Sequence, residues 1–301
     1  MTTLKRVTKI LGLLILATAL AGCSMFGLGD PKFKSDLRLK VAVMPFEDRA
    51  GVGGEVVGMN TAKLVAEKLS QSDHLLVVPY TEVEAYMKAQ GIPNPLSQNT
   101  ATVVGRGLGL NAIVLGSVTE ISQVTTRKGW RKYFRFITNR RDYIDAVLIS
   151  QVVDVPHGVI LGSDTGRGEV MAGKSLEDFF LNDRKGSFTQ ASVAASMDQA
   201  VEELSENVLE ALSRASWEGY ITRVEGNTAT LSAGTDVGIR AGDTFVVYAV
   251  ADKITNAAGQ TFSIPGNVKA TLEAIQVSDK TSQLKILSGS TVMGEIVRYV
   301  E

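Results

Sequence analysis

Cysteine and histidine are both scarce in this sequence. The 301 residues include one cysteine, Cys23, and two histidines, His74 and His157. A single thiol cannot form a disulfide within the chain, and two histidines without further cysteines make a structural zinc site improbable. We therefore expect neither disulfides nor a metal centre.

Long apolar runs are also missing. The longest near the start, residues 10–21, covers about twelve residues, well short of the roughly 20 that a membrane-spanning helix needs. Lys5, Arg6 and Lys9 precede it, so residues 1–22 are predicted to be a secretory signal peptide. One reading is an ordinary signal peptide, in which Cys23 occurs after the cleavage site by chance.

The end of this segment resembles a bacterial lipobox, Leu20-Ala21-Gly22-Cys23. The resemblance implies cleavage before Cys23 and acyl chains on that residue, which together would anchor the chain firmly. Ser24 follows, where Asp would signal retention at the inner membrane. We therefore expect a lipid anchor in the outer membrane, on its periplasmic face.

The charge balance excludes general nucleic-acid binding. Without residues 1–22 the chain has 28 Lys and Arg against 32 Asp and Glu, a net charge of −4. With 45% hydrophobic residues it is too apolar for wholesale disorder. The mature length is sufficient for one large domain or two ordinary ones.

Residues 23–37 are rich in glycine without periodicity and are predicted to be a tether. From residue 38 the pattern alternates between strands and amphipathic helices, which predicts an α/β domain with a mixed sheet and packed helices over 38–216. The expected strands are 41–44, 75–78, 112–118, 143–155 and 159–169, the last two antiparallel; the expected helices lie near 58–69, 81–91, 98–108 and 193–212.

The helix near residue 81 carries the spacing of a capping box, Thr81 to Glu84, and Gly91 is placed to end it. Beyond residue 216 the pattern changes to short β segments separated by Gly, Asn and Asp. Residues 217–301 are therefore predicted to be a small all-β barrel-like domain, beginning with a hairpin around Gly226-Asn227.

Two families resemble these regions. Residues 40–48 (KVAVMPFED) and 112–118 (AIVLGSV) are similar to the CsgG-like envelope lipoproteins and the amino-terminal domain of TolB. Residues 217–221 (WEGYI) and 237–245 (VGIRAGDTF) are similar to the carboxy-terminal domain of flagellar assembly protein T. The resemblance implies a periplasmic, often ring-forming part of an envelope machine, and no enzyme.

Residues 168–175 (GEVMAGKS) satisfy the Walker A pattern. A phosphate-binding loop needs a preceding parallel strand and a following helix, whereas this segment follows an expected antiparallel hairpin and precedes a short, interrupted helix. We expect a chance match and no bound nucleotide. The glycines of 105–109 precede a strand, the reverse of a dinucleotide fingerprint, and are expected to end a helix.

His74 follows Asp73, but no nucleophile elbow accompanies them, so a loop histidine at a helix end is the expectation. No catalytic residue and no cofactor are therefore predicted.

The segment 127–141 contains seven basic residues, no acid and several aromatics. Such a segment can contact an anionic surface, its charges meeting phosphates while its rings enter the headgroup boundary. The alternative is a solvated hairpin paired with an acidic neighbour. The candidate contact residues are Arg127, Lys128, Trp130, Arg131, Lys132, Arg135, Arg140 and Arg141.

The sequence thus predicts a non-enzymatic outer-membrane lipoprotein that self-associates and acts as a scaffold or assembly factor of an envelope machine, docking another envelope protein through residues 217–301. Two alternatives stay open: an export channel of the CsgG type, with insertions near 124–142 and 172–189 as membrane hairpins, and an activator of a cell-wall synthase. Basic and acidic residues interrupt the alternation of both insertions, which disfavours the channel.

Overall fold

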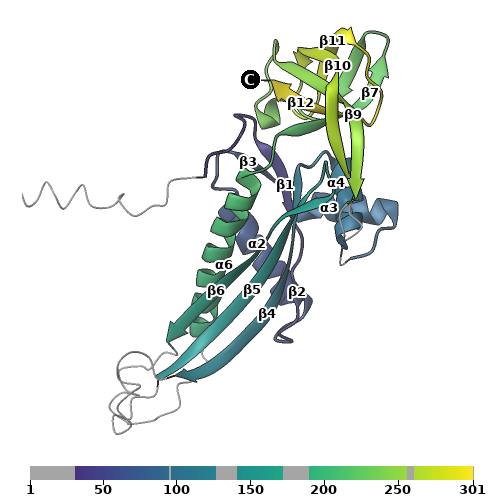
Figure 1. Ribbon diagram of the computed structural model, residues 1–301. Coiled ribbons are helices and arrows are strands. Elements are labelled where there is room, and N and C mark those ends of the chain that lie inside the picture. Colours follow the sequence, from purple (N-terminus) through teal and green to yellow (C-terminus); the bar gives the residue numbers. More distant parts are fainter. Residues whose placement is uncertain (1–30, 95, 127–140, 172–189, 256–260, 301) are drawn as a thin grey trace, which may run out of the picture. The chain divides into compact units, whose positions relative to one another are not determined.

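The computed structural model describes residues 31–94, 96–126, 141–171, 190–255 and 261–300 (Figure 1). From Phe33 onward, the described residues belong to one compact unit. It contains a mixed sheet with packed helices and a closed antiparallel barrel, so the predicted fold class is confirmed.

The sheet has the strand order β3-β1-β4-β5-β6, and the short β2 pairs with β4. β1 is parallel to both β3 and β4, whereas β4, β5 and β6 run antiparallel; the predicted antiparallel pairing of β5 with β6 is confirmed. The elements of this part are β1 (Leu39–Val43), β2 (Glu47–Asp48), α2 (Glu55–Leu69), β3 (Leu75–Val78), α3 (Tyr80–Gln90), α4 (Gln98–Leu108), β4 (Ala112–Thr126), β5 (Arg141–Asp154), β6 (Val159–Met171) and α6 (Gln190–Ser213).

Helices pack on both faces of the sheet. α2 and α6 share one apolar cluster with Val41 and Val43 of β1, while α3 and α4 share another with Ala42 and Met44. Successive strand residues point to opposite faces, so β1 is buried on both sides. This burial explains its continuous apolar sequence.

Close contact between α6 and β6 depends on two glycines (Figure 1). A Cβ at Gly166 would lie 2.1 Å from the carbonyl oxygen of Ala200, and one at Gly168 would lie 1.7 Å from that of Ser196. Gly168, the first glycine of the Walker-like pattern, therefore lets a helix backbone approach a strand. Residues 172–175 of that pattern lie outside the described residues.

The predicted capping box at Thr81 is wrong. α3 begins at Tyr80, and its N-cap, Pro79, uses no side-chain hydrogen bond; instead the Pro79 carbonyl accepts from the backbone N–H of Glu82. The ring of Pro79 fixes its φ at a value suited to the residue before the first helical turn. Thr81 is therefore the second residue of the helix and not its N-cap. The end of α3 at Gly91, in the left-handed region with a φ of 66°, is confirmed.

The barrel closes in the order β10-β11-β8-β7-β12-β9. β9 and β10 are longer than predicted, and their pairing is shifted around Pro265, which lacks the N–H that a regular ladder needs. The strands are β7 (Glu218–Glu225), β8 (Thr228–Leu231), β9 (Thr244–Thr255), β10 (Thr261–Val277), β11 (Ser282–Gly289) and β12 (Ile296–Val300), with a 3-10 turn η2 (Thr235–Val237).

Candidate functional site

Buried polar contacts connect the barrel to the α/β part. Asn111, just before β4, accepts from the Lys40 backbone N–H at 2.8 Å and donates to the Glu218 carbonyl at 2.7 Å. The Lys40 ammonium pairs with Asp236 at 2.9 Å and is almost fully buried. Because a buried amide and a buried ammonium are each satisfied across this junction, the two parts are held in a defined register.

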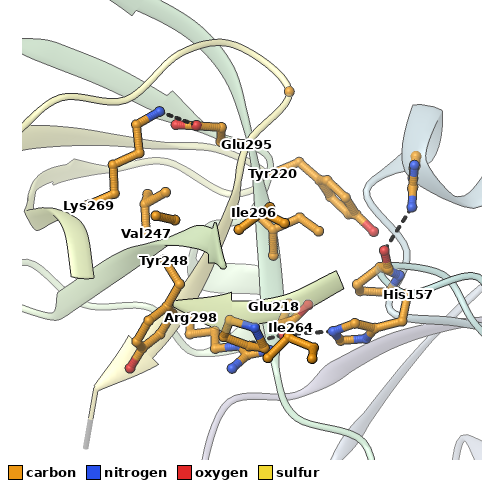
Figure 2. Close-up of a pocket in the computed structure, with 16 residues that line it drawn as sticks. His157, Glu218, Tyr220, Val247, Tyr248, Ile264, Lys269, Glu295, Ile296 and Arg298 are labelled. Carbon is orange, nitrogen blue, oxygen red and sulfur yellow. Dashed lines mark hydrogen bonds and ion pairs between the residues drawn. The ribbon is translucent and has the colours of Figure 1, made fainter. Parts of the chain in front are cut away.

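A cavity of about 540 Å³ opens beside this junction (Figure 2). α4 and the β5–β6 turn supply one wall, and strands β7, β9, β10 and β12 supply the others. Its walls mix charged, aromatic and aliphatic side chains. The lining residues are Arg106, Pro156, His157, Glu218, Tyr220, Val247, Tyr248, Ala249, Val250, Ile264, Pro265, Lys269, Gly294, Glu295, Ile296 and Arg298.

Glu218 is the most buried charged group of this cavity, with 2% of the residue exposed. Its Oε1 accepts a hydrogen bond from Arg298 Nε at 2.6 Å and lies 3.7 Å from His157 Nε2. Its Oε2 has no hydrogen-bond partner among the described residues. Burial raises the pKa of the Glu218 carboxyl, and the charges of His157 and Arg298 oppose that rise.

His157 links Glu218 to the β5–β6 turn. Its Nδ1 lies 2.7 Å from Asp154 Oδ2, and this hydrogen bond raises the pKa of the imidazole, which burial opposes. The turn is tight because Gly158 adopts a φ of 68° and donates its N–H to the Asp154 carbonyl at 2.8 Å. Both ring nitrogens of His157 therefore face carboxylates of the chain itself.

Tyr220 brings a second buried polar atom to the cavity. Its hydroxyl is buried and has no hydrogen bond of good geometry among the described residues. Burial raises the pKa of this phenol, and the nearby Arg106 guanidinium opposes the rise. Arg106 itself donates to the carbonyl oxygens of Val155, at 3.4 Å, and Pro156, at 2.8 Å.

The opposite wall is closed by an ion pair and aliphatic side chains. Lys269 pairs with Glu295, which also accepts hydrogen bonds from the Thr291 hydroxyl and the Val292 backbone N–H. Burial alone would raise the pKa of Glu295, but these hydrogen bonds outweigh it and the pKa is lowered. The cations that line the cavity are thus engaged with carboxylates or backbone carbonyls of the chain itself.

Most residues that the sequence singled out lie elsewhere. Cys23 and the candidate contacts from Arg127 to Arg140 lie outside the described residues. Arg141 begins β5, opposite Thr126 of β4. His74 lies between α2 and β3, where its ring stacks on Phe33 with centroids 4.5 Å apart. The predicted membrane and anchor contacts of this group therefore stay predictions.

Sequence reasoning missed the cavity. It recognised the turn at His157 but gave no role to Glu218, Tyr220 or Arg298. The one signal was an acid, Glu218, set among Trp217, Tyr220 and Ile221 at the start of an apolar strand.

Metal-ligating clusters and membrane-spanning helices are both absent from the described residues. No group of three or more His, Cys, Asp or Glu side chains there could hold a metal ion. In the same part of the chain, no helix is long and apolar enough to cross a membrane.

Several solved structures are similar to this chain at low sequence identity. The hypothetical protein CT253 from Chlamydia trachomatis is 15% identical, with a TM-score of 0.38, over 58% of this chain and 98% of that one. Lipoprotein GNA1162 from Neisseria meningitidis is 17% identical, with a TM-score of 0.33, over 48% and 91%. The PelC dodecamer from Paraburkholderia phytofirmans is 12% identical, with a TM-score of 0.30, over 58% and 92%.

Comparison by sequence gives a more specific result. No curated protein matches the chain significantly. The resemblance of residues 217–301 to the carboxy-terminal domain of flagellar assembly protein T stays a prediction. The profile of one family, described as curli production assembly/transport component CsgG, matches residues 28–241. That match covers more than half of the sequence, and the chain therefore belongs to the CsgG family.

Proposed function

We propose that the mature chain is a non-enzymatic lipoprotein, anchored in the outer membrane through Cys23, that assembles with copies of itself into a periplasmic scaffold of an envelope machine. The observation that carries this proposal is the family match over residues 28–241 behind a lipobox-like sequence at 20–23. The family's description concerns assembly and transport, which are tasks of position and association.

The charged groups of the cavity are mostly engaged with one another. His157 is hydrogen-bonded through Nδ1 to Asp154 at 2.7 Å, and its Nε2 lies 3.7 Å from Glu218 Oε1. The Glu218 carboxylate is held by Arg298 at 2.6 Å. These contacts fix the geometry of the junction, as a scaffold requires.

A second function, an oligomeric export channel, is favoured by one specific observation. The segments 127–140 and 172–189 both leave the same end of the sheet, because Thr126 pairs with Arg141 and Tyr143 pairs with Met171. Two segments at one sheet end could enter a shared membrane barrel as hairpins, since a spanning strand takes ~9–11 residues.

The composition of these segments weighs against the channel. If residues 130–136 were a spanning strand, Lys132 would fall on the same face as Trp130, Phe134 and Phe136, and the acids at 177–178 would interrupt the second segment. A basic side chain on the lipid face near mid-bilayer costs ~2–4 kcal/mol, and a ring repeats that cost in every subunit. We therefore place the scaffold first and the channel second.

Anchoring is tested by fractionation. The variant Cys23→Ser, exported with an ordinary cleavable signal, is expected to stay soluble in the periplasm, while the native chain sediments with the outer membrane. Sedimentation of the variant with membranes at high salt would show that another segment anchors the chain.

Assembly and conductance separate the two functions. The purified lipidated chain is expected to form closed rings of uniform mass in detergent by mass photometry and electron microscopy. In planar bilayers the same rings are expected to give no stable conductance. Discrete, reproducible conductance steps would establish the channel, and a monomer at all concentrations would exclude both.

A further inference from the structure

The strand β6 forms one edge of the sheet, and α6 lies along it (Figure 1). On the side away from β5, β6 has no neighbouring strand among the described residues. Side chains of α6 take the place of that strand. The Arg167 backbone N–H donates to Glu203 Oε2 at 2.8 Å, and the Glu169 backbone N–H donates to Gln199 Oε1 at 3.1 Å.

A third contact extends this pattern, because Asn207 Nδ2 donates to the Thr165 carbonyl at 3.3 Å. Gln199, Glu203 and Asn207, which we call the edge ladder, are four residues apart, a rise of ~6.0 Å along a helix. The strand residues that they contact are two apart, a rise of ~6.6 Å. Because the two repeats match, a helix antiparallel to the strand reaches an outward-facing backbone group at each step.

The strand sequence permits this close contact. Gly166 and Gly168, which alternate with the contacted residues, have no Cβ that would meet the α6 backbone. In an antiparallel strand, alternate residues direct their backbone groups to opposite sides. Gly166 and Gly168 therefore bond towards β5, and residues 165, 167 and 169 direct theirs away from it. Without the edge ladder, these groups would form an open template for another strand.

The sequence of this edge is complementary to a second copy of itself. If two β6 strands paired antiparallel about a two-fold axis at Gly168, Arg167 of each would lie opposite Glu169 of the other. Such a pairing opposes residues that both direct their backbone groups outward, as an antiparallel ladder requires. Opposite charges directly across a pair are favourable. Arg167, although it contacts Asp145, keeps 60% of its side chain exposed.

We propose that the edge ladder is an autoinhibitory contact, which keeps β6 closed to antiparallel pairing with β6 of a second copy. The inference rests on the proposed function for its consequence, because a chain that assembles with copies of itself must exclude competing contacts. A two-fold contact joins two copies and closes, so it would withdraw chains from a larger ring. Self-association therefore proceeds through surfaces other than this edge.

Two variants of the mature Cys23→Ser chain carry the test. The ladder variant removes the polar atoms but keeps side-chain length and helix propensity: Gln199→Met, Glu203→Met and Asn207→Leu. The control variant adds equivalent apolar side chains at exposed positions of α6 that make no hydrogen bond with β6 in the described part of the chain: Asp198→Leu, Glu202→Met and Glu206→Met.

Hydrogen exchange, followed by NMR, reports whether the edge is covered. In the ladder variant the Arg167 amide is expected to exchange at least about tenfold faster, because it loses a charged acceptor, and the Glu169 amide severalfold faster. The Gly168 amide, which faces β5, is the internal reference and is expected to keep its rate. The control variant is expected to leave all three rates unchanged.

Disulfide cross-linking reports whether the open edge pairs. Thr165→Cys and Met171→Cys are added to each chain, because the proposed two-fold pairing places these positions opposite each other at ~5.5 Å between Cα atoms, within reach of a disulfide. Within one strand they are six residues apart, about 20 Å, so no internal disulfide forms. The ladder variant is expected to give linked dimers at least about tenfold faster than the native ladder or the control variant.

The conservative variant Glu203→Gln keeps an acceptor oxygen for the Arg167 N–H and is expected to behave as the native chain in both measurements. If the ladder variant does not fold, Glu203→Met alone carries the test, with Glu206→Met as its control. Equal exchange rates in ladder and control variants would overturn the inference. So would rapid cross-linking with the native ladder, or a ladder variant that forms no linked dimer.

Neither measurement needs a membrane or a ring, so the two proposals fail separately. If the native chain forms rings but the ladder and control variants behave alike, this inference alone is overturned. If the ladder variant cross-links as expected but the lipidated chain forms no rings, the proposed function alone is overturned.

Discussion

Removing the partner of Glu218 is expected to destabilise the barrel junction. Arg298→Met keeps most of the side-chain volume but deletes the guanidinium that donates to Oε1 at 2.6 Å. The Glu218 side chain is 1% exposed and that of Arg298 is 33% exposed. Breaking a fully buried pair costs ~3–5 kcal/mol, and the partial exposure of Arg298 reduces our expectation to about 2–3 kcal/mol near neutral pH.

The pH dependence of this loss identifies its cause. Burial raises the pKa of Glu218 above the ordinary value of 4.5, and Arg298 opposes the rise, so the variant should raise the pKa further. A folded-state pKa above the unfolded one means that the charge is tolerated better in the unfolded chain. The destabilisation should therefore be small at about pH 4.5 and grow as pH rises through the folded pKa of Glu218.

Thermal unfolding from about pH 4.5 to 8 measures the effect, with an expected fall in Tm of roughly 4–12 °C at the upper end. Arg223→Met is the matched control, because Arg223 pairs with Glu225 at the surface and both side chains are more than half exposed. That pair is worth ~0–1 kcal/mol. The double variant Glu218→Gln/Arg298→Met should recover part of the loss. A pH-independent loss, or one no larger than that of the control, would refute the reasoning.

Further predictions concern other parts of the chain. Gly168→Ala should destabilise the protein by about 1–3 kcal/mol or more in denaturant titrations, because its Cβ would meet the Ser196 carbonyl at 1.7 Å. ATP should show no binding by calorimetry, with no change on Lys174→Ala. The raised pKa of His157 stabilises the fold below about pH 6.5 and the gain is lost as pH rises through that pKa, so His157→Gln should flatten this part of the stability profile. Charge reversal at Arg131 and Lys132 should weaken binding to anionic vesicles and reduce its salt dependence, as measured by co-sedimentation.

Much of the fold was readable because local patterns and packing agree. The apolar run of β1 predicted a strand buried on both faces, and the structure places α2 and α6 on one face and α3 and α4 on the other. The predicted helix at 98–108 has the observed bounds, since Ser97 caps it by accepting from the Thr100 N–H and Gly109 ends it in the left-handed region.

Other features depend on contacts that the local sequence does not predict. The function of Gly166 and Gly168 becomes visible only once α6 is seen to lie on β6. Thr81 has the spacing of a capping box, but the helix begins earlier, where the Pro79 carbonyl accepts a hydrogen bond from the Glu82 N–H. Neither outcome can be inferred from spacing alone, because each depends on which of two competing contacts forms in the folded chain.

The cavity was the hardest feature to predict, because its charged residues come from distant parts of the chain. Arg106, His157, Glu218 and Arg298 belong to a helix, a turn and two barrel strands. In the sequence, each of these residues has the pattern of a solvent-exposed charge. They line one cavity only because the barrel packs against the β5–β6 turn. Sequence periodicity does not predict contacts between segments so far apart in the chain.

The long strands β4, β5 and β6 separate the two candidate contact regions of this protein. Asp154, at one end of β5, is hydrogen-bonded to His157 of the cavity wall. At the other end of β5, Arg141 pairs with Thr126, the residue before segment 127–140. Tyr143 pairs there with Met171, the residue before segment 172–189. A strand of 14 residues spans about 45 Å at ~3.3 Å per residue. A membrane surface or a second subunit can therefore contact one end of the sheet without blocking the cavity at the other. Glu218→Gln, a change at the cavity, should therefore leave binding to anionic vesicles unchanged in co-sedimentation. A large change in vesicle binding on this substitution would contradict the separation.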